Sequence, residues 1–279
     1  MGRDENIKVF NDTESLSKTK YAKDVEASIE GQVIIKETDD IGNVPKDKYE
    51  EKAKVNVSRK RTCEAAKVYV ADGEKVVIHN FASAVNPGGG VVKGATAQEE
   101  SICRISTAYL CLVTESNKRE FYNPHRALQD RIYNDDIIYT PDVVVFKSDT
   151  SNPVKLPDNE VYKVNMITCA APNLNSRNMR NDTKYIRKVT DKELLAIHVK
   201  RLRRILDVAI KNGNECIILG AFGCGAFMNN PEVVARAARE VVTEYRYAFK
   251  NIEFAVYCSS KDTRNYDVFA RVMRVFNML

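Results

Sequence analysis

Short apolar runs alternate along most of this chain with stretches in which apolar residues recur every three or four positions. Apolar runs of this length are typical of buried strands, and the second pattern is typical of helices with one buried face. From residue 62 onward we expect strands at residues 75–81, 143–146, 164–168, 216–219 and 252–257. Alternating helices and strands predict an α/β fold, with a sheet that carries helices on both faces.

The expected helices have recognisable signals at their ends. Thr190 and Glu193 have the spacing of a capping box, and Asn230 followed by Pro231 is typical of a helix start. Gly213 is placed to end the helix that begins near Thr190. The helices are predicted at residues 62–70, 102–112, 190–212, 231–245 and 266–276.

The first 60 residues differ from the rest because they are polar and charged. Residues 32–35 and 54–57 predict two strands at the margin of the fold, joined by a loop at 39–48. No linker rich in proline, glycine or serine divides the chain. We therefore expect an N-terminal extension, residues 1–60, packed on one catalytic domain, residues 61–279.

Composition excludes several classes of protein. The seven cysteines are scattered without a CxxC pair, which argues against a disulfide framework or a structural zinc site and favours reduced thiols in the cytoplasm. Three histidines without an HExxH motif give little support to a metal centre or a catalytic triad. The polar start shows no signal peptide, and no apolar run approaches the ~20 residues of a membrane span. The net charge of +5 only slightly favours acidic ligands.

Seven of the twelve glycines fall in two clusters, and each cluster follows a predicted strand and precedes a predicted helix. Ligands of open α/β sheets bind at the carboxyl ends of strands, where backbone N–H groups and helix starts attract phosphate. Two such loops predict a cradle for a diphosphate, although glycines also occur simply in tight turns. Neither cluster is a Walker loop or a GxGxxG motif. Their members are Gly88, Gly89, Gly90 and Gly94, then Gly220, Gly223 and Gly225.

Two adjacent carboxylates, Glu99 and Glu100, open the helix that follows the first cluster. They are candidates for proton transfer, but Thr96 and Glu99 also have the spacing of a capping box. Two neighbouring carboxylates are costly to ionise together, which favours a proton on one of them, whereas a helix start favours the anion. The sequence leaves this balance open.

Three further features of the chain have simple structural interpretations. Cys224 stands between two loop glycines without a nearby basic partner, so we expect a packing residue rather than a nucleophile. The ring of Phe227 would pack either on a ribose or base, or in the core. The basic residues between Arg180 and Arg204 predict a solvated surface, with attraction of a polyanion as the alternative.

The order of these motifs resembles the bacterial-type poly(ADP-ribose) glycohydrolases. Residues 80–90, which end in Asn86-Pro87-Gly88-Gly89-Gly90, precede Gln98-Glu99-Glu100 by seven residues, as in the signature of that family. Residues 219–227 resemble its second phosphate loop, and residues 139–146 and 170–173 are also similar. The resemblance spans roughly residues 60–258.

The resemblance implies a macrodomain-like fold, a three-layer mixed sheet flanked by helices, which binds ADP-ribose in a cleft at the strand ends. By position, Glu100 would be the catalytic acid and base, and Glu99 would orient the ribose. Hydrolysis of ribose–ribose bonds in poly(ADP-ribose) would release ADP-ribose and would need neither a cofactor nor a metal. The ligand-binding residues would be Ser83, Asn86, Gly88, Gly89, Gly90, Gln98, Gly223, Cys224, Gly225, Ala226 and Phe227.

Two other functions fit the same motifs. One is a binding module that reads ADP-ribose without cleaving it, which the acid pair disfavours. The other is a hydrolase that acts on single ADP-ribose groups attached to macromolecules. Residues that would contact the adenine are not identified by the sequence.

Overall fold

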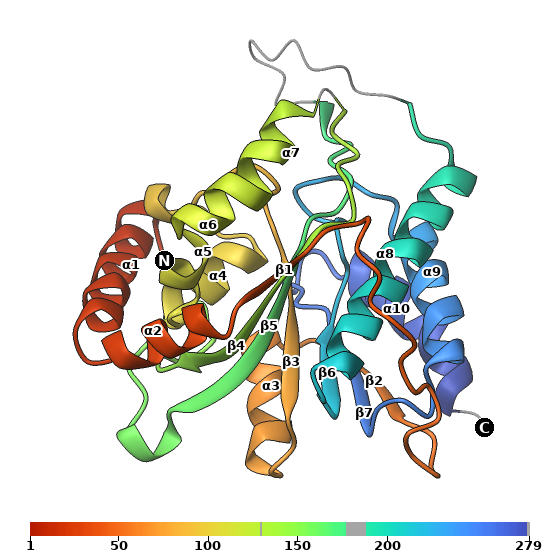
Figure 1. Ribbon diagram of the computed structural model, residues 1–279, viewed down its shortest axis with the longest axis horizontal. Helices are drawn as coiled ribbons and strands as arrows, with labels where there is room; N and C mark the ends of the chain where they lie inside the picture. The colour runs from red at the N-terminus through yellow and green to blue at the C-terminus, as the bar shows by residue number, and fades with distance from the viewer. Residues whose placement is uncertain (129, 177–187, 278–279) are drawn as a thin grey trace.

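A mixed sheet of seven strands lies between two layers of helices in the computed structural model, which describes residues 1–128, 130–176 and 188–277 (Figure 1). The strand order is β1-β4-β5-β3-β6-β7-β2. The strands from β5 to β2 are parallel, and β4 is antiparallel to both of its neighbours. The strands are β1 (Val33–Ile35), β2 (Lys54–Ser58), β3 (Val76–Phe81), β4 (Ile137–Val145), β5 (Tyr162–Cys169), β6 (Cys216–Leu219) and β7 (Asn251–Ala255).

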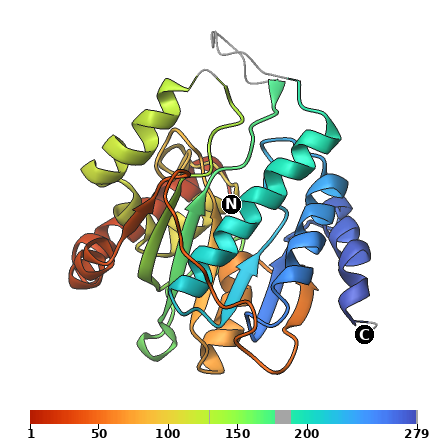
Figure 2. The same ribbon diagram turned by 45° about the vertical axis from the view of Figure 1, so that its right-hand side comes forward.

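The helices cover both faces of this sheet, as Figure 2 shows from a second side. Successive side chains of β3 point to opposite faces, so that Val77 joins one apolar core while Val76 and Ile78 join the other. Residues of α8, α9 and α10 complete the first core, and residues of α1, α3, α4 and α5 complete the second. These helices are α1 (Arg3–Lys18), α2 (Ala22–Glu30), α3 (Thr62–Ala71), α4 (Gln98–Ile105), α5 (Ala108–Leu112), α6 (Glu115–Asn117), α7 (Asn123–Ala127), α8 (Asp191–Lys211), α9 (Pro231–Glu244) and α10 (Arg264–Met273).

The predicted α/β layering is confirmed, and the end signals of two helices act as expected. The Thr190 hydroxyl accepts a hydrogen bond from the Glu193 N–H, while the Glu193 carboxylate accepts one from the Thr190 N–H. The Asn230 side chain accepts a hydrogen bond from the Glu232 N–H at the start of α9. Local sequence therefore determines where α8 and α9 begin.

The two marginal strands in the first 60 residues are confirmed, but helices α1 and α2 in the same segment were not predicted. The buried residues of α1 are Asn6, Phe10, Thr13 and Ser17. Three of these four are polar. The buried face of α1 therefore does not appear in the sequence as apolar residues at helical spacing. The division of the chain near residue 60 stays a prediction.

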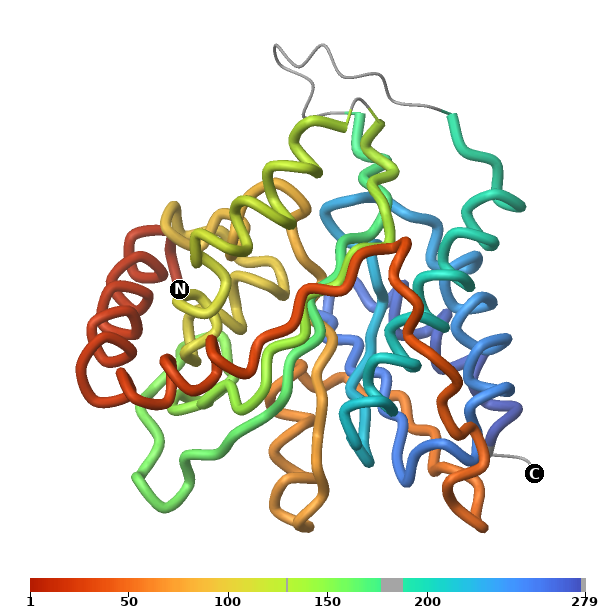
Figure 3. The backbone as a smooth tube through the Cα atoms, viewed as in Figure 1, coloured from red at the N-terminus to blue at the C-terminus, as the bar shows by residue number. Residues whose placement is uncertain are grey.

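Strands β1 and β2 form the two opposite edges of the sheet, so the segment between them has to cross the molecule. Figure 3 shows this crossing, and Val44 and Ala53 from the segment join the core that α8 covers. The Arg204 guanidinium also donates to the Asp39 carbonyl along this path. The N-terminal residues thus complete the sheet at both edges.

The single helix predicted over residues 102–112 is wrong, because the chain forms α4 and α5 there. Ser106 has an extended backbone, and it pairs with Val145 of β4 through an isolated bridge. The Thr107 N–H donates to the Val144 carbonyl, and the Val144 N–H donates to the Thr107 hydroxyl, each at 3.0 Å. Pairing with the sheet therefore interrupts a continuous helical pattern.

Arg201, within the basic run, is a buried structural residue. Arg201 is 2% exposed, and its guanidinium donates to the Asp135 carboxylate at 2.6 Å. It also donates to the carbonyls of Ala170, Ile132 and Tyr133. Arg203, by contrast, makes an exposed ion pair with Glu244. Arg180, Lys184 and Arg187 lie outside the described residues.

We expect Arg201→Met to lower the free energy of unfolding by about 3–5 kcal/mol, because it removes the buried cation of the Asp135 ion pair and the donor to three backbone carbonyls. Arg203→Met is the matched control on the same helix and should cost less than ~1 kcal/mol. Urea denaturation of the three proteins measures both values. An equal loss of unfolding free energy in the two variants would contradict the structural role of Arg201.

Candidate active site

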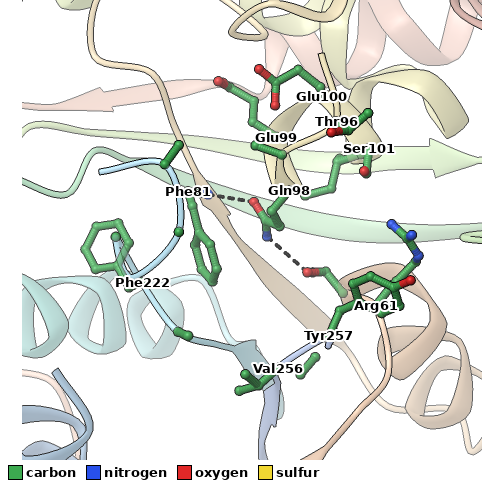
Figure 4. A pocket seen from close by; sticks show the side chains of 18 of the residues that line it. Arg61, Phe81, Thr96, Gln98, Glu99, Glu100, Ser101, Phe222, Val256 and Tyr257 are labelled. Atoms are coloured by element: carbon green, nitrogen blue, oxygen red, sulfur yellow. Dashed lines mark hydrogen bonds between the residues drawn. The ribbon is translucent and has the colours of Figure 1, made fainter. Parts of the chain in front are cut away.

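A cavity of about 470 Å³ opens at the carboxyl ends of β3, β6 and β7. The first turn of α4 forms one wall, and the loop after β6 forms another. Figure 4 shows Glu99 and Glu100 at one end of the cavity, Val256 and Tyr257 at the other, and Gln98 between them. Ligands of α/β sheets bind at this position.

The Glu99 carboxyl is enclosed by hydrogen-bond donors. It is 3% exposed and accepts from the Ser83 N–H at 2.8 Å and from the Asn80 side chain at 3.3 Å. The alternative of a capping box between Thr96 and Glu99 is therefore wrong, and Ala97 occupies the N-cap position of α4. Since β3 and the segment after it supply both donors, tertiary contacts hold Glu99 in place.

Burial raises the pKa of Glu99 to about 8, and the neighbouring Glu100 acts in the same direction. The donors around the Glu99 carboxyl oppose this rise without cancelling it. Burial thus outweighs the effect of the helix start, and Glu99 holds a proton at neutral pH. The structure thus decides whether Glu99 is protonated or ionised, which the sequence left open.

The Glu100 carboxyl has one satisfied oxygen and one unsatisfied oxygen. Its Oε1 accepts from the Gly90 N–H at 2.8 Å. Its Oε2 is buried and has no hydrogen-bond partner within the described part of the chain. The side chain is 8% exposed and lines the cavity. An unpaired buried oxygen is costly, which makes this atom a natural contact for a ligand hydroxyl or bridging oxygen.

The triple-glycine loop closes tightly over both carboxyls. Gly88 and Gly89 have φ of +67° and +60°, a conformation that side-chain-bearing residues rarely adopt. A Cβ on Gly89 would collide with Glu100 Oε1 and lie 3.1 Å from Glu99 Oε2. The three glycines and Asn86 do not line the cavity itself, and Asn86 is exposed. The loop is therefore built against the acid pair.

Gln98 joins three elements behind the acid pair. Its carbonyl oxygen accepts from the Phe81 N–H at 2.9 Å, and its amide donates to the Thr62 hydroxyl and the His79 carbonyl. Two of these bonds appear as dashed lines in Figure 4. Gln98 thereby fixes the first turn of α4 against β3 and α3.

The second glycine loop supplies the opposite wall. Of its predicted residues, all but Cys224 line the cavity: Gly223, Gly225, Ala226 and Phe227. Ser83 lines it from the first loop. Burial raises the pKa of Cys224 to about 12, so this thiol is protonated at neutral pH and is a poor nucleophile.

Sequence reasoning missed the far end of the cavity. The Arg61 guanidinium lies 3.9 Å from the centre of the Tyr257 ring, and both residues line the cavity. Tyr257 is 53% exposed, so a planar ligand could reach its ring. Arg61 directly precedes α3 and Tyr257 follows β7, so no local motif joins them.

Two kinds of feature are absent from the described residues: a cluster of metal-binding side chains, and a helix long and apolar enough to cross a membrane. Within residues 1–128, 130–176 and 188–277, no group of three or more His, Cys, Asp or Glu side chains could hold a metal ion. Over the same ranges, every helix is too short or too polar to cross a membrane.

Comparison with known proteins identifies relatives of this chain. The family model described as microbial-type PARG, catalytic domain, matches residues 6–148, just over half of the 279 residues. No curated protein matches the chain. Solved structures, however, match nearly its full length.

The poly(ADP-ribose) glycohydrolase (PARG) of Thermomonospora curvata is 26% identical, with a TM-score of 0.82 over 97% of this chain and 100% of that one. The same enzyme bound to the inhibitor ADP-HPD gives 27% identity and a TM-score of 0.80, covering 96% of this chain and 99% of that one. The PARG of Deinococcus radiodurans in complex with ADP-ribose is 28% identical. Its TM-score is 0.77 over 90% of this chain and 97% of that one.

The raised pKa of Glu99 predicts a pH dependence of stability. Because the folded state has a pKa of about 8 where the usual value is 4.5, it binds more protons than the unfolded chain between these values. The contribution of Glu99 to the free energy of unfolding is fully present below about pH 4.5 and is lost as the pH rises through 8. We expect Glu99→Gln to flatten the decline in unfolding free energy between pH 5.5 and 8.5, measured by urea denaturation.

Glu115→Gln is the control, since Glu115 forms an exposed ion pair with Lys118. This variant should retain the slope of the wild-type protein. If the unfolding free energy of Glu99→Gln declines with pH as steeply as that of the wild type, Glu99 does not hold the proton assigned to it.

Proposed function

The chain belongs to the microbial-type poly(ADP-ribose) glycohydrolase family, and we propose that Glu100 is its catalytic acid and base. The activity is hydrolysis of ribose–ribose O-glycosidic bonds in poly(ADP-ribose), which releases ADP-ribose. The observation that supports Glu100 is its Oε2 atom, which is buried beside the cavity and unpaired among the described residues. A bound substrate oxygen would satisfy it.

The reaction proceeds in two proton transfers on one carboxyl. Glu100 donates its proton to the 2′-oxygen as the bond from that oxygen to C1″ of the distal ribose breaks. The resulting oxocarbenium-like ribose lies near the substrate diphosphate, which stabilises its charge. A water molecule then attacks C1″, and Glu100 takes the released proton.

Glu99 has a different role in this scheme. Its carboxyl is fixed by Ser83 and Asn80, which leaves it well placed to orient the distal ribose hydroxyls. Because burial favours the protonated form of Glu99, the acid pair carries at most one negative charge next to an anionic ligand, and none while Glu100 holds the proton that it donates. This arrangement lets ADP-ribose approach Glu100.

We propose that the second glycine loop and Ser83 bind the diphosphate and the distal ribose, and that Gly88, Gly89 and Gly90 contribute by holding the acid pair. Ser83 and the wall from Gly223 to Phe227 line the cavity, while the triple-glycine loop holds the carboxyls from behind. Adenine would then lie at the opposite end, against Tyr257 and Arg61, where an exposed ring and a guanidinium face each other.

A cytoplasmic location is also proposed. It is supported by the seven cysteines, all of which are free thiols. Proteins of oxidising compartments tend to pair such residues.

The catalytic proposal is tested by incubating the protein with poly(ADP-ribose) and measuring released ADP-ribose, alongside substrates that carry a single ADP-ribose group. Glu100→Gln should lower kcat by about 10²–10⁴-fold, because it removes the group that transfers the proton, while ADP-ribose binding is retained. Glu115→Gln, on the exposed surface, should leave turnover unchanged. Undiminished turnover by Glu100→Gln would remove Glu100 from the mechanism, and no release from polymer would overturn the substrate assignment.

The adenine proposal predicts a loss of affinity at the other end of the cavity. Stacking of a base on an aromatic ring contributes about 1–3 kcal/mol, so Tyr257→Ala should raise KM about tenfold and change kcat much less. Tyr257→Phe keeps the ring and should behave like the wild type in steady-state kinetics. An unchanged KM for Tyr257→Ala would place the base elsewhere.

A further inference from the structure

One buried side chain, Asn229, joins three segments around the second glycine loop. It is 2% exposed and does not line the cavity. Its amide nitrogen donates to the carbonyls of Pro172 at 2.7 Å, Gly223 at 3.1 Å and Phe227 at 3.2 Å. Its own backbone N–H donates to the Gly223 carbonyl as well. Both ends of the loop that lines the cavity are therefore fastened to one side chain.

The orientation of the Asn229 carboxamide is set by His198 of α8. The Asn229 Oδ1 atom lies 2.8 Å from His198 Nε2. Since three carbonyl oxygens surround the Asn229 nitrogen, the amide must point its nitrogen at them and its oxygen at the histidine. His198 Nε2 must then carry the hydrogen, and burial lowers the pKa of His198 to about 4, so the ring is neutral.

The loop has little room to adopt another conformation. Gly223 has φ of +77°, and a Cβ there would lie 2.6 Å from Ala171 Cβ and 2.9 Å from the Asn229 nitrogen. The adjacent Phe222 ring packs edge-on against His79 and His198, at centroid distances of 4.4 and 5.5 Å. The Asn229 amide therefore supplies the hydrogen bonds to the loop, while packing of Phe222 on the two histidine rings supports it from below.

We propose that Asn229, oriented by His198, is a positioning residue that holds the diphosphate-binding loop in its ligand-competent shape. This inference rests on the proposed function of the site. The loop binds ADP-ribose before, during and after bond cleavage, so its distortion weakens ground state and transition state alike. Loss of Asn229 therefore acts on KM and on ADP-ribose affinity, with little effect on kcat.

The test is Asn229→Asp, which keeps the shape but replaces two N–H donors with an oxygen facing three carbonyls. Calorimetry should give a Kd for ADP-ribose raised about tenfold or more, with KM raised in parallel and kcat within about threefold of the wild type. Asn230→Asp is the matched control. It adds the same charge one residue away and keeps the acceptor that caps α9, so its Kd should equal that of the wild type.

A second pair of variants covers the case in which thermal denaturation shows that Asn229→Asp does not fold. His198→Phe removes the Nε2 donor and should raise the Kd, because Asn229 loses the contact that orients it. His198→Gln retains an amide near the Nε2 position and should restore binding.

The possible results distinguish a failure of the role proposed for Asn229 from a failure of the proposed function. A wild-type protein that neither binds ADP-ribose nor releases it from polymer overturns both. A wild-type protein that does so, with a Kd unchanged in folded Asn229→Asp or in His198→Phe, overturns only the role of Asn229. An equal loss of affinity in Asn230→Asp would attribute the effect to charge and would also overturn it.

Discussion

The site depends on the burial of two adjacent carboxyls beneath a glycine loop. A carboxyl taken out of water needs hydrogen-bond donors or a proton. The chain supplies both, since Ser83 and Asn80 donate to Glu99, the Gly90 N–H donates to Glu100, and Glu99 is protonated at neutral pH. One oxygen of the pair, Glu100 Oε2, has no hydrogen-bond partner among the described residues. Gly89 packs against these carboxyls so closely that a side chain at its position would collide with Glu100.

Helix α1 supports this arrangement from behind. The Asn6 side chain donates to the Gly94 carbonyl at 3.1 Å, and the Arg3 guanidinium donates to the Lys93 carbonyl at 2.5 Å. The Thr13 hydroxyl donates to the Arg104 carbonyl at the end of α4. Helix α1 thus holds both the exit of the triple-glycine loop and the helix that carries the acid pair. This explains why its buried face is polar where a core-forming helix would be apolar.

The sheet brings the two ends of the cavity together. Because β3, β6 and β7 are parallel neighbours, the segments after all three emerge at one edge. The acid pair follows β3, the second loop follows β6, and Tyr257 follows β7. Residues separated by more than 150 positions therefore face one ligand-sized space. The parallel topology is what turns two glycine loops into one site.

The sequence alone determined the parts of the molecule that local physics specifies. Strand β6 and the start of α9 follow from an apolar run and from Asn230 with Pro231. The spacing of the glycines with Gln98-Glu99-Glu100 identified the family. These features were readable because a buried strand, a helix cap and a positive-φ turn each require particular residues within a few positions.

Only the tertiary structure decided the rest. Whether Glu99 caps its helix or holds a proton depends on burial, and burial comes from β3 and its following loop. The break between α4 and α5 comes from pairing with β4. Helix α1 lacks an apolar stripe because Asn6 and Thr13 on its buried face donate to backbone carbonyls. Arg61 meets Tyr257, and Asn229 meets His198, across elements with no shared motif. Such contacts are set by how the layers pack, which the order of residues along one element does not reveal.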